Sequence, residues 1–372
     1  MRIVHLADLH LGFRRYNRST SKGVNCREAD VFKAFREALT KIKELNPDLL
    51  LIAGDVFHWS RPNNLALVQT QGLLQNFIYQ SNIETIVIAG NHDAVRTKDN
   101  TCILELFSFI DKVRVVSYEA EIIVVNHDQT ARIACLPHSG LLEADKIDLR
   151  PNRDFQFNIL MVHGTIDPRF VNDDGGGNVP PDLLEMDWDY VACGHFHSYR
   201  HIDRFIYYAG AIERTSNNIW QEAEEDKGFI EFDLEHKKVF FHPLATRKTI
   251  DLPMIDCQTK TIEEVNNLIA DHVKQVDITD AVVRQRILNL PSSCQNQLDY
   301  KQIRNFKSQA LHYEISSKSP HTKTARLFAP EGTGGGLYED AKQFLQSYPI
   351  SQDIDRDTFV EKGLTYLQRT AG

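Results

Sequence analysis

Short apolar stretches alternate with longer amphipathic ones over the first two-thirds of the chain. Apolar residues dominate 2–7, 48–54 and 84–90, which is typical of buried strands. Between them, in 28–45 and 65–80, apolar residues recur every three or four positions, the spacing of an amphipathic helix. This alternation of strands and helices predicts an α/β fold with a largely parallel sheet covered by helices.

Further strand-like segments follow, and their spacing favours antiparallel or mixed pairing. They lie at 120–126, 131–137, 157–164, 189–195, 204–210, 228–234 and 238–244. Together with the first strands, they predict a domain over 1–245 in which mixed sheets pack together with helices outside.

The pattern changes near residue 245. Two helices and two strands are predicted beyond it, at 261–276, 300–309, 281–291 and 310–319. They indicate a small α+β domain over 246–330. The Gly-rich stretch 332–336 reads as a flexible linker, and the tail 331–372 carries two short amphipathic helices.

Composition and charge narrow the class of protein. With 372 residues and 42% hydrophobic content, the chain is expected to form two globular domains and an appendage. No apolar run is long enough to span a bilayer, and the N-terminus enters a strand pattern directly, unlike a signal peptide. The six scattered cysteines favour a reducing cytoplasm. The net charge of −9 argues weakly against indiscriminate nucleic-acid binding, although 246–330 is net positive.

Polar side chains follow five of the predicted strands at the point where each strand ends. The clusters are Asp8-x-His10, Gly54-Asp55, Gly90-Asn91-His92-Asp93, His163-Gly164 and Gly194-His195-x-His197. The carboxyl ends of parallel strands meet at one edge of a sheet, where ligand sites form. A single such cluster is adequately explained as a polar turn, but five of them predict one shared site.

The residue types in these clusters suit divalent metal ions. Asp, Asn and several His without Cys fit two ions of intermediate hardness, such as Mn²⁺, Fe²⁺ or Zn²⁺. Asp55 is the natural bridge between them. Two such ions stabilise both the attacking and the leaving oxygen in a displacement at phosphorus. The adjacent Gly54, Gly90 and Gly194 are expected to let the backbone approach the ions closely.

The motifs "DLH", "GD", "GNHD", "VHG" and "GHFH" resemble those of the calcineurin-like metallophosphoesterase superfamily across 1–245. The resemblance implies one ion held by Asp8, His10, Asp55 and His197, and a second held by Asp55, Asn91, His163 and His195. It also implies that His92 meets the scissile phosphate or protonates the leaving oxygen. Either Asp93 or a backbone group is expected to orient the His92 imidazole.

Two longer stretches, "VHLADLHLG" and "GDVFHWSRP", are similar to DNA repair nucleases of the SbcD and meiotic-recombination-eleven type. The resemblance implies a manganese-dependent nuclease that degrades duplex ends as an exonuclease and nicks single strands or hairpins as an endonuclease. It places His58 beside the metals, where it either positions the phosphodiester or supports a ligand by hydrogen bonding. It also makes 246–330 a capping domain that contacts DNA.

The same resemblance implies partners. The tail would dock on an SbcC-like ABC/SMC-type ATPase in double-strand-break repair, and two copies of the chain would form a dimer. For the tail, packing back on its own body is the alternative. Val68, Leu73, Leu74 and Phe77 fit a dimer face or a core face equally well. Lys301, Arg304 and Lys307 fit either DNA phosphates or a solvated helix face.

Two other functions compete with the nuclease. One is a metallophosphoesterase that acts on small nucleotide phosphodiesters, because the fold alone does not fix the substrate. The other is a non-catalytic scaffold that recruits the ATPase through its tail. The complete set of candidate ligands argues against a scaffold, since a decayed site is expected to lose at least one ligand.

Overall fold

A mixed sheet carries the N-terminal strands, in the order β12-β11-β1-β2-β3-β4. We describe it from a computed structural model that covers 1–94, 101–126, 129–166, 177–319, 337–348 and 355–370. The strands are β1 (Arg2–Leu6), β2 (Leu49–Ala53), β3 (Glu84–Ile88), β4 (Val113–Val116), β11 (Gly228–Asp233) and β12 (Lys238–Pro243). Strands β1 to β4 run parallel to one another. Strand β11 pairs antiparallel with β1, and β12 pairs antiparallel with β11.

A second mixed sheet has the order β5-β6-β7-β8-β10-β9. Its strands are β5 (Glu121–Asn126), β6 (Thr130–Leu136), β7 (Phe157–His163), β8 (Tyr190–Gly194), β9 (Arg200–Asp203) and β10 (Ile206–Tyr208). The four central strands are parallel, and the outer β5 and β9 are antiparallel. The prediction of mixed sheets is confirmed, although β4 and β9 were not predicted.

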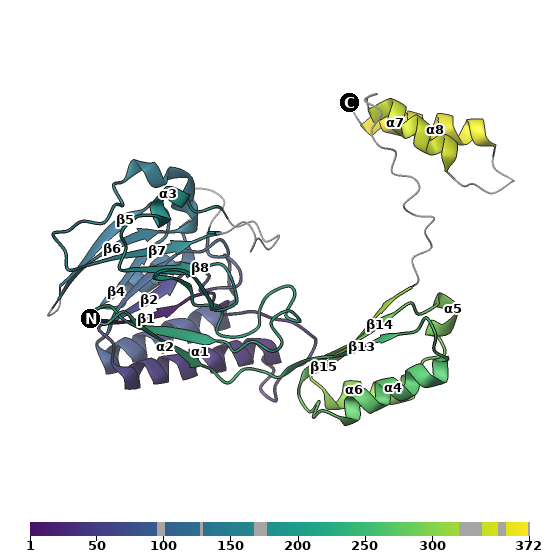
Figure 1. Ribbon diagram of the computed structural model, residues 1–372, viewed down its shortest axis with the longest axis horizontal. Coiled ribbons are helices and arrows are strands. Elements are labelled where there is room, and N and C mark those ends of the chain that lie inside the picture. The colour runs from purple at the N-terminus through teal and green to yellow at the C-terminus, as the bar shows by residue number, and fades with distance from the viewer. Residues whose placement is uncertain (95–100, 127–128, 167–176, 320–336, 349–354, 371–372) are drawn as a thin grey trace. The chain divides into compact units, whose positions relative to one another are not determined.

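Helices α1 (Cys26–Leu45) and α2 (Asn64–Ser81) pack on the outer face of the first sheet (Figure 1). Helix α1 begins at Asn25, whose side chain accepts hydrogen bonds from two backbone N–H groups of the first turn. It ends at Asn46, which adopts a left-handed conformation.

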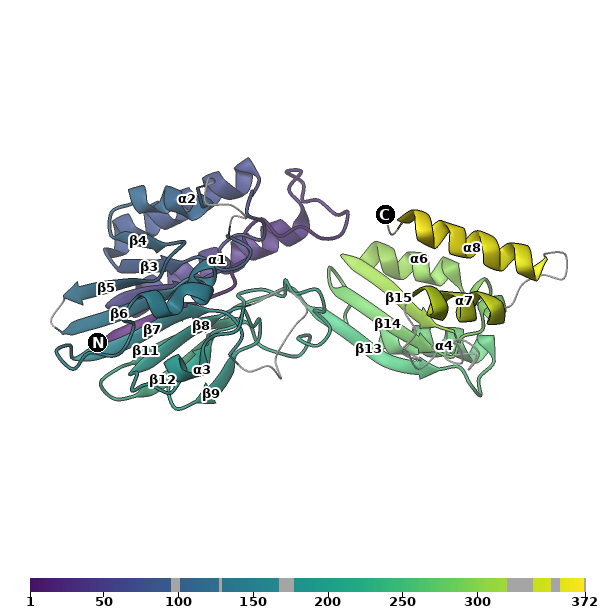
Figure 2. The same cartoon turned by 90° about the horizontal axis from the view of Figure 1, so that it is seen from above.

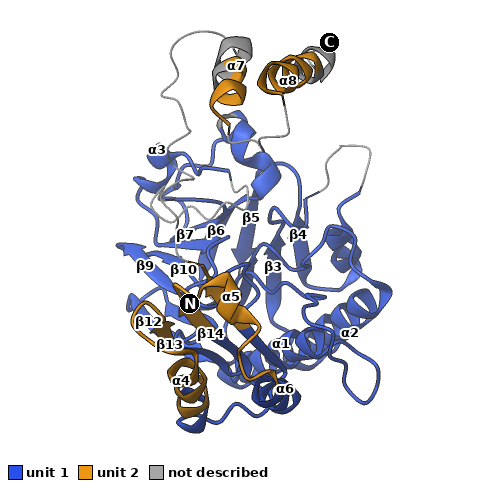
Figure 3. Ribbon diagram, turned by 90° about the vertical axis from the view of Figure 1, so that its right-hand side faces the viewer, with its two compact units in different colours: residues 1–252, 272–284, 301–314 blue, residues 253–271, 285–300, 315–372 orange. Residues whose placement is uncertain are grey.

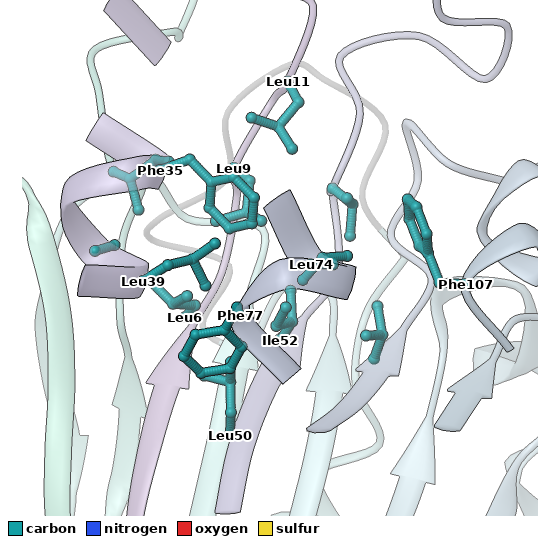
Figure 4. Close-up of a cluster of buried hydrophobic side chains, with 14 of the residues drawn as sticks. Leu6, Leu9, Leu11, Phe35, Leu39, Leu50, Ile52, Leu74, Phe77 and Phe107 are labelled. Atoms are coloured by element: carbon teal, nitrogen blue, oxygen red, sulfur yellow. The ribbon is translucent and has the colours of Figure 1, made fainter. Parts of the chain in front are cut away.

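The buried faces of these helices form one apolar layer with the strands beneath them. Figure 4 shows Phe35 and Leu39 from α1 and Leu74 and Phe77 from α2 in one cluster with Leu6, Leu50 and Ile52. Leu74 and Phe77 therefore belong to the core, whereas Val68 is 71% exposed.

The two sheets pack face to face through a second apolar layer. Along β2, Leu50 and Ile52 face the helices, and Leu49 and Leu51 face the other sheet. Ile159 on β7 and Tyr190 on β8 meet them from the second sheet. The far face of that sheet is covered by a 3₁₀ segment (His138–Lys146) and the short helix α3 (Pro181–Leu184).

The later part of the chain contains the predicted α+β elements and tail helices. The predicted ones are α4 (Ile262–Lys274), β14 (Val282–Leu288), α6 (Tyr300–Gln309), β15 (His312–Lys318), α7 (Leu337–Ser347) and α8 (Arg356–Thr370). The strand β13 (Thr249–Asp256) and the short helix α5 (Ser292–Gln295) were not predicted. The three strands form one sheet in the order β13-β14-β15. Helices α7 and α8 lie side by side (Figure 2), with the Tyr348 and Phe359 rings 6.1 Å apart.

The chain forms two compact units (Figure 3). Unit 1 comprises Met1–Leu252, His272–Arg284 and Lys301–Glu314, and unit 2 comprises Pro253–Asp271, Gln285–Tyr300 and Ile315–Gly372. Both six-stranded sheets and all predicted site residues lie in unit 1. None of the helices in the described part of the chain combines the length and apolar composition that a membrane span requires.

Candidate metal centre

The predicted ligands follow the carboxyl ends of their strands in a strained backbone. Asp8, His10, Asp55 and His195 have φ of 51°, 46°, 52° and 104°, in a region that residues other than glycine rarely adopt. Backbone hydrogen bonds hold the first loops together: Asp8 N–H donates to Gly54 O (3.1 Å) and His10 N–H to Asp55 O (2.9 Å). Strain of this kind typically marks a functional site.

At three glycines the backbone lies in close contact with the candidate ligands and with neighbouring loops. A Cβ atom on Gly54 would lie 2.2 Å from His163 Nδ1, and one on Gly90 would lie 2.2 Å from Asp55 Oδ1. On Gly194 it would lie 1.8 Å from Ala53 O. Any larger residue at these positions would displace the candidate ligands.

The first group of donors comes from the loops after β1 and β8. One ligand atom from each of Asp8, His10 and His197 lies within 4.8 Å of the others, and all three residues are buried. His10 Nε2 is 2.9 Å from His197 Nε2 and 3.7 Å from Asp55 Oδ2. Two imidazole nitrogens facing each other leave at least one lone pair without a proton, which suits a cation between them.

The second group lies on the other side of Asp55. Asp55 Oδ2 is 3.5 Å from His163 Nε2, and Asn91 Oδ1 lies 3.0 Å from His163 Nε2 and 3.1 Å from His195 Nδ1. His163 Nδ1 lies 2.8 Å from Ala53 O and donates to it, which leaves the neutral ring's Nε2 as a lone pair. One oxygen of Asp55 thus lies at similar distances from His10 and His163, in the position of a bridge.

Burial and charge keep most of these imidazoles neutral, as metal ligands must be. Burial lowers the pKa of His195 to about 3 and that of His10 well below its ordinary value. Burial also lowers the pKa of His163, but the Asp55 and Asp8 carboxylates and the hydrogen bond to Ala53 O together outweigh it and raise the value to about 9. A position that attracts a proton so strongly also favours a metal cation. The donor set therefore fits divalent ions.

His92 and His58 lie beside the first group. His92 Nδ1 lies 2.8 Å from His58 O and donates to it, and the His92 backbone N–H donates to Asp55 Oδ1 (2.9 Å). The partner of the His92 imidazole is thus a backbone carbonyl and not Asp93. Because Nδ1 is engaged, Nε2 of His92 is left for a substrate. His58 Nδ1 is 3.3 Å from His10 Nδ1, and burial lowers the His58 pKa to about 4.

Residues 1–199 match the family model described as calcineurin-like phosphoesterase, which is more than half of the chain. The chain belongs to this family. The predicted resemblance and the expectation of a phosphoesterase are confirmed.

This phosphoesterase is similar over most of its length to archaeal proteins named DNA double-strand break repair protein Mre11. It is 28% identical to that of Methanocaldococcus jannaschii over 72% of this chain and 69% of the relative. It is 28% identical to that of Thermoplasma acidophilum over 95% of both chains. For Methanococcus maripaludis the identity is 26%, over 76% of this chain and 78% of the relative.

Asp93 has a structural role that the sequence left open. The Asp93 carboxylate is fully buried and accepts hydrogen bonds from the N–H groups of Val56 (3.0 Å), Phe57 (2.9 Å) and Gly90 (3.1 Å). Asp93 therefore ties the loop after β2, which carries Asp55, to the loop after β3. Its place beside the ligands in the GNHD motif was the only sequence signal of this role.

Proposed function

We propose that this phosphoesterase is a manganese-dependent DNA nuclease of double-strand-break repair. The observation that carries the proposed chemistry is Asp55 Oδ2 between His10 Nε2 (3.7 Å) and His163 Nε2 (3.5 Å). Two donor groups around one carboxylate suit a pair of divalent ions. Asp8, His10, Asp55 and His197 would hold one, and Asp55, Asn91, His163 and His195 the other. This mixture of carboxylate, amide and imidazole donors suits divalent ions of intermediate hardness such as Mn²⁺, Fe²⁺ or Zn²⁺, and Mn²⁺ is proposed from the family resemblance.

When bound, two such ions lower the pKa of a water nucleophile and stabilise the charge on the phosphate. In this mechanism His92 acts on the substrate. Its imidazole is fixed by the hydrogen bond that Nδ1 donates to the His58 carbonyl (2.8 Å), so Nε2 is the nitrogen that faces the substrate. With a proton on both nitrogens, the ring would give the Nε2 proton to the leaving oxygen and become neutral. His58 lies beside it, with the two rings stacked 5.4 Å apart, and would position the phosphodiester.

DNA is the proposed substrate because the relatives carry the names of DNA repair proteins, and one aligns over 95% of both chains. Exonuclease action on duplex ends and endonuclease action on single strands or hairpins are both part of the proposal.

We assign 1–245 to the nuclease domain and 246–330 to a domain that contacts DNA. On α6, Lys301, Arg304 and Lys307 are exposed, whereas Ile303 and Phe306 are buried, and the exposed cations suit phosphate contacts.

The tail 331–372 is proposed to bind an SbcC-like ABC/SMC-type ATPase. The hairpin of α7 and α8 leaves Phe344 and Tyr348 40% and 45% exposed, as apolar anchors for a helical partner. The side chains of Tyr366 and Leu367, near the end of α8, lie outside those that the structure describes.

Two further expectations complete the proposal. We propose a homodimer, for which Val68 is an exposed apolar residue on α2. A cytoplasmic location is proposed from the cysteines, all six of which are free thiols.

The test is cleavage of an end-labelled DNA duplex by the purified chain with Mn²⁺, with Mg²⁺ or with EDTA. We expect shortening with Mn²⁺ that falls about 10²- to 10⁴-fold in His92→Ala, which leaves every proposed ligand in place. His236→Ala, which removes an exposed histidine near the end of β11, is the matched control and should cut normally. Turnover of bis-(p-nitrophenyl) phosphate without cleavage of any DNA would favour a small-molecule phosphodiesterase instead.

A further inference from the structure

A buried lysine lies directly behind one of the proposed metal ligands. Lys227, just before β11, is 1% exposed, and its ammonium donates to the backbone carbonyl of His197 (2.8 Å). The same carbonyl accepts the N–H of Ala211 (2.9 Å). Gly210 packs so closely on this loop that a Cβ there would lie 2.9 Å from His197 O. The backbone of His197 is therefore clamped from two sides.

This clamp matters because the His197 ring donates no hydrogen bond to a fixed acceptor among the described residues. His197 Nε2 faces His10 Nε2, and Nδ1 is buried without a hydrogen-bond partner in the described part of the chain. Metal-binding imidazoles usually donate the second N–H to a fixed acceptor. His163 does so through Ala53 O (2.8 Å). At His197, the backbone has to hold the ring in place.

The charge of Lys227 is balanced locally. Its ammonium lies 2.5 Å from Glu222 Oε2 and 3.8 Å from Glu225 Oε2. Glu222 is itself 6% exposed. A buried ammonium close to a site for cations would repel them, and the paired carboxylate offsets this repulsion. Lys227 can thus hold the His197 carbonyl without opposing metal binding.

We propose that Lys227 is a positioning residue for the metal ion on the His197 side of the centre, with Glu222 as its charge partner. This inference rests on the proposed two-metal site. The clamp fixes His197 Nε2 opposite His10 and so determines the affinity for that ion. The ion on the His163 side does not depend on Lys227, because His163 has its own anchor.

The experiment is Mn²⁺ titration by isothermal calorimetry of the full chain, with unfolding followed in parallel. Lys227→Met alone would leave Glu222 as an unpaired buried anion, which would itself attract cations. The informative variant is therefore Lys227→Met combined with Glu222→Gln. We expect it to bind one Mn²⁺ as the wild type does and the other about 10- to 100-fold more weakly. Lys237→Met is the matched control, since Lys237 pairs with Asp189 (2.6 Å) away from the site, and both affinities should stay unchanged.

A second pair of changes keeps the test decisive if the first double variant does not fold. Lys227→Gln with Glu222→Gln retains an N–H donor near the His197 carbonyl, and it should keep more of the affinity than the Met version keeps. Unchanged affinity for both ions in either double variant, with only a lower melting temperature, would overturn the role of Lys227. A wild-type chain that binds two ions but cuts no DNA would overturn the proposed substrate and leave this inference standing.

Discussion

The same strands build two different regions: the apolar layer beneath α1 and α2, and a polar edge, which is the candidate metal centre in the loops that follow the strands. The two regions differ in the charge they bury and in their backbone geometry. In the layer, Leu50 and Ile52 are fully buried among apolar neighbours in ordinary strand geometry. Three residues later, Asp55 is equally buried but charged, with φ of 52°. Burying charge and straining the backbone costs stability. The layer therefore supplies stability, and the edge uses part of it to hold a site that is complete only with its ions.

Asp55→Ala tests whether ion binding at the polar edge can be removed without a loss of stability in the apolar layer. Because Asp55 Oδ2 lies between His10 and His163, we expect the variant to lose both ions and DNA cleavage to fall by at least about 10³-fold. Metal content after desalting, measured by mass spectrometry, checks the first expectation. Two ions retained per chain would rule out the bridging position. In EDTA, the variant should unfold at nearly the same urea concentration as the wild type.

The converse change is Phe35→Ala in the apolar layer. Phe35 is fully buried between α1 and the sheet (Figure 4), so its truncation should lower the free energy of unfolding by about 3–5 kcal/mol. Urea unfolding followed by circular dichroism measures this loss. Below the unfolding transition, Mn²⁺ affinity should remain that of the wild type. A loss of affinity in the folded variant would mean that the layer and the edge are not separable.

Asp93→Ala tests the boundary between the regions, because it should damage both stability and binding. It leaves the buried N–H groups of Val56, Phe57 and Gly90 without their acceptor, which should cost about 2–4 kcal/mol. The loosened loop carries Asp55, so Mn²⁺ affinity should fall as well. Asp93→Asn keeps one acceptor oxygen and should lose less of each. Equal melting temperatures for Asp93→Ala and the wild type would contradict this role.

The sequence predicted the layer because its signal is local and periodic. The apolar spacing in α1 and the continuous apolar run of β2 identify both elements without any knowledge of their neighbours. Strands β4 and β9 were missed because each has only four residues and lies at the edge of its sheet, where half-exposed positions blur the pattern. Tertiary pairing defines them.

The candidate site likewise has one part that the sequence predicts, the ligands, and one part that it does not, the residues that support them. Its ligand types follow strand ends in recognisable motifs, so the predicted residues could be named from the sequence. Their supports could not, because they come from distant segments. The Asp93 carboxylate reaches N–H groups 36 and 37 residues away, and the Lys227 ammonium reaches a carbonyl 30 residues away. The left-handed backbone of Asp8 and His10 is likewise fixed by the loop after β2 and not by local propensity.

His5 is an exception to the comparison, since it is a polar residue buried in the layer between the two sheets. Its ring is fully buried, with Nδ1 3.0 Å from the Tyr190 hydroxyl, and burial lowers its pKa from 6.5 to about 3. Below pH 6.5 the unfolded chain takes up a proton that the folded chain refuses. The stability contributed by the neutral His5 ring is thus complete above pH 6.5 and falls as the pH drops toward 3, by up to about 1.4 kcal/mol per pH unit.

The last prediction is the removal of this pH dependence by His5→Gln, which keeps a hydrogen-bonding side chain but cannot titrate. Urea unfolding in EDTA at pH 7, 6, 5 and 4 should show the wild type losing more stability per pH unit than the variant. Parallel profiles would mean that the His5 ring is protonated in the folded state. In that case the layer would tolerate buried charge as the edge does, and the distinction between the two regions would rest on backbone strain alone.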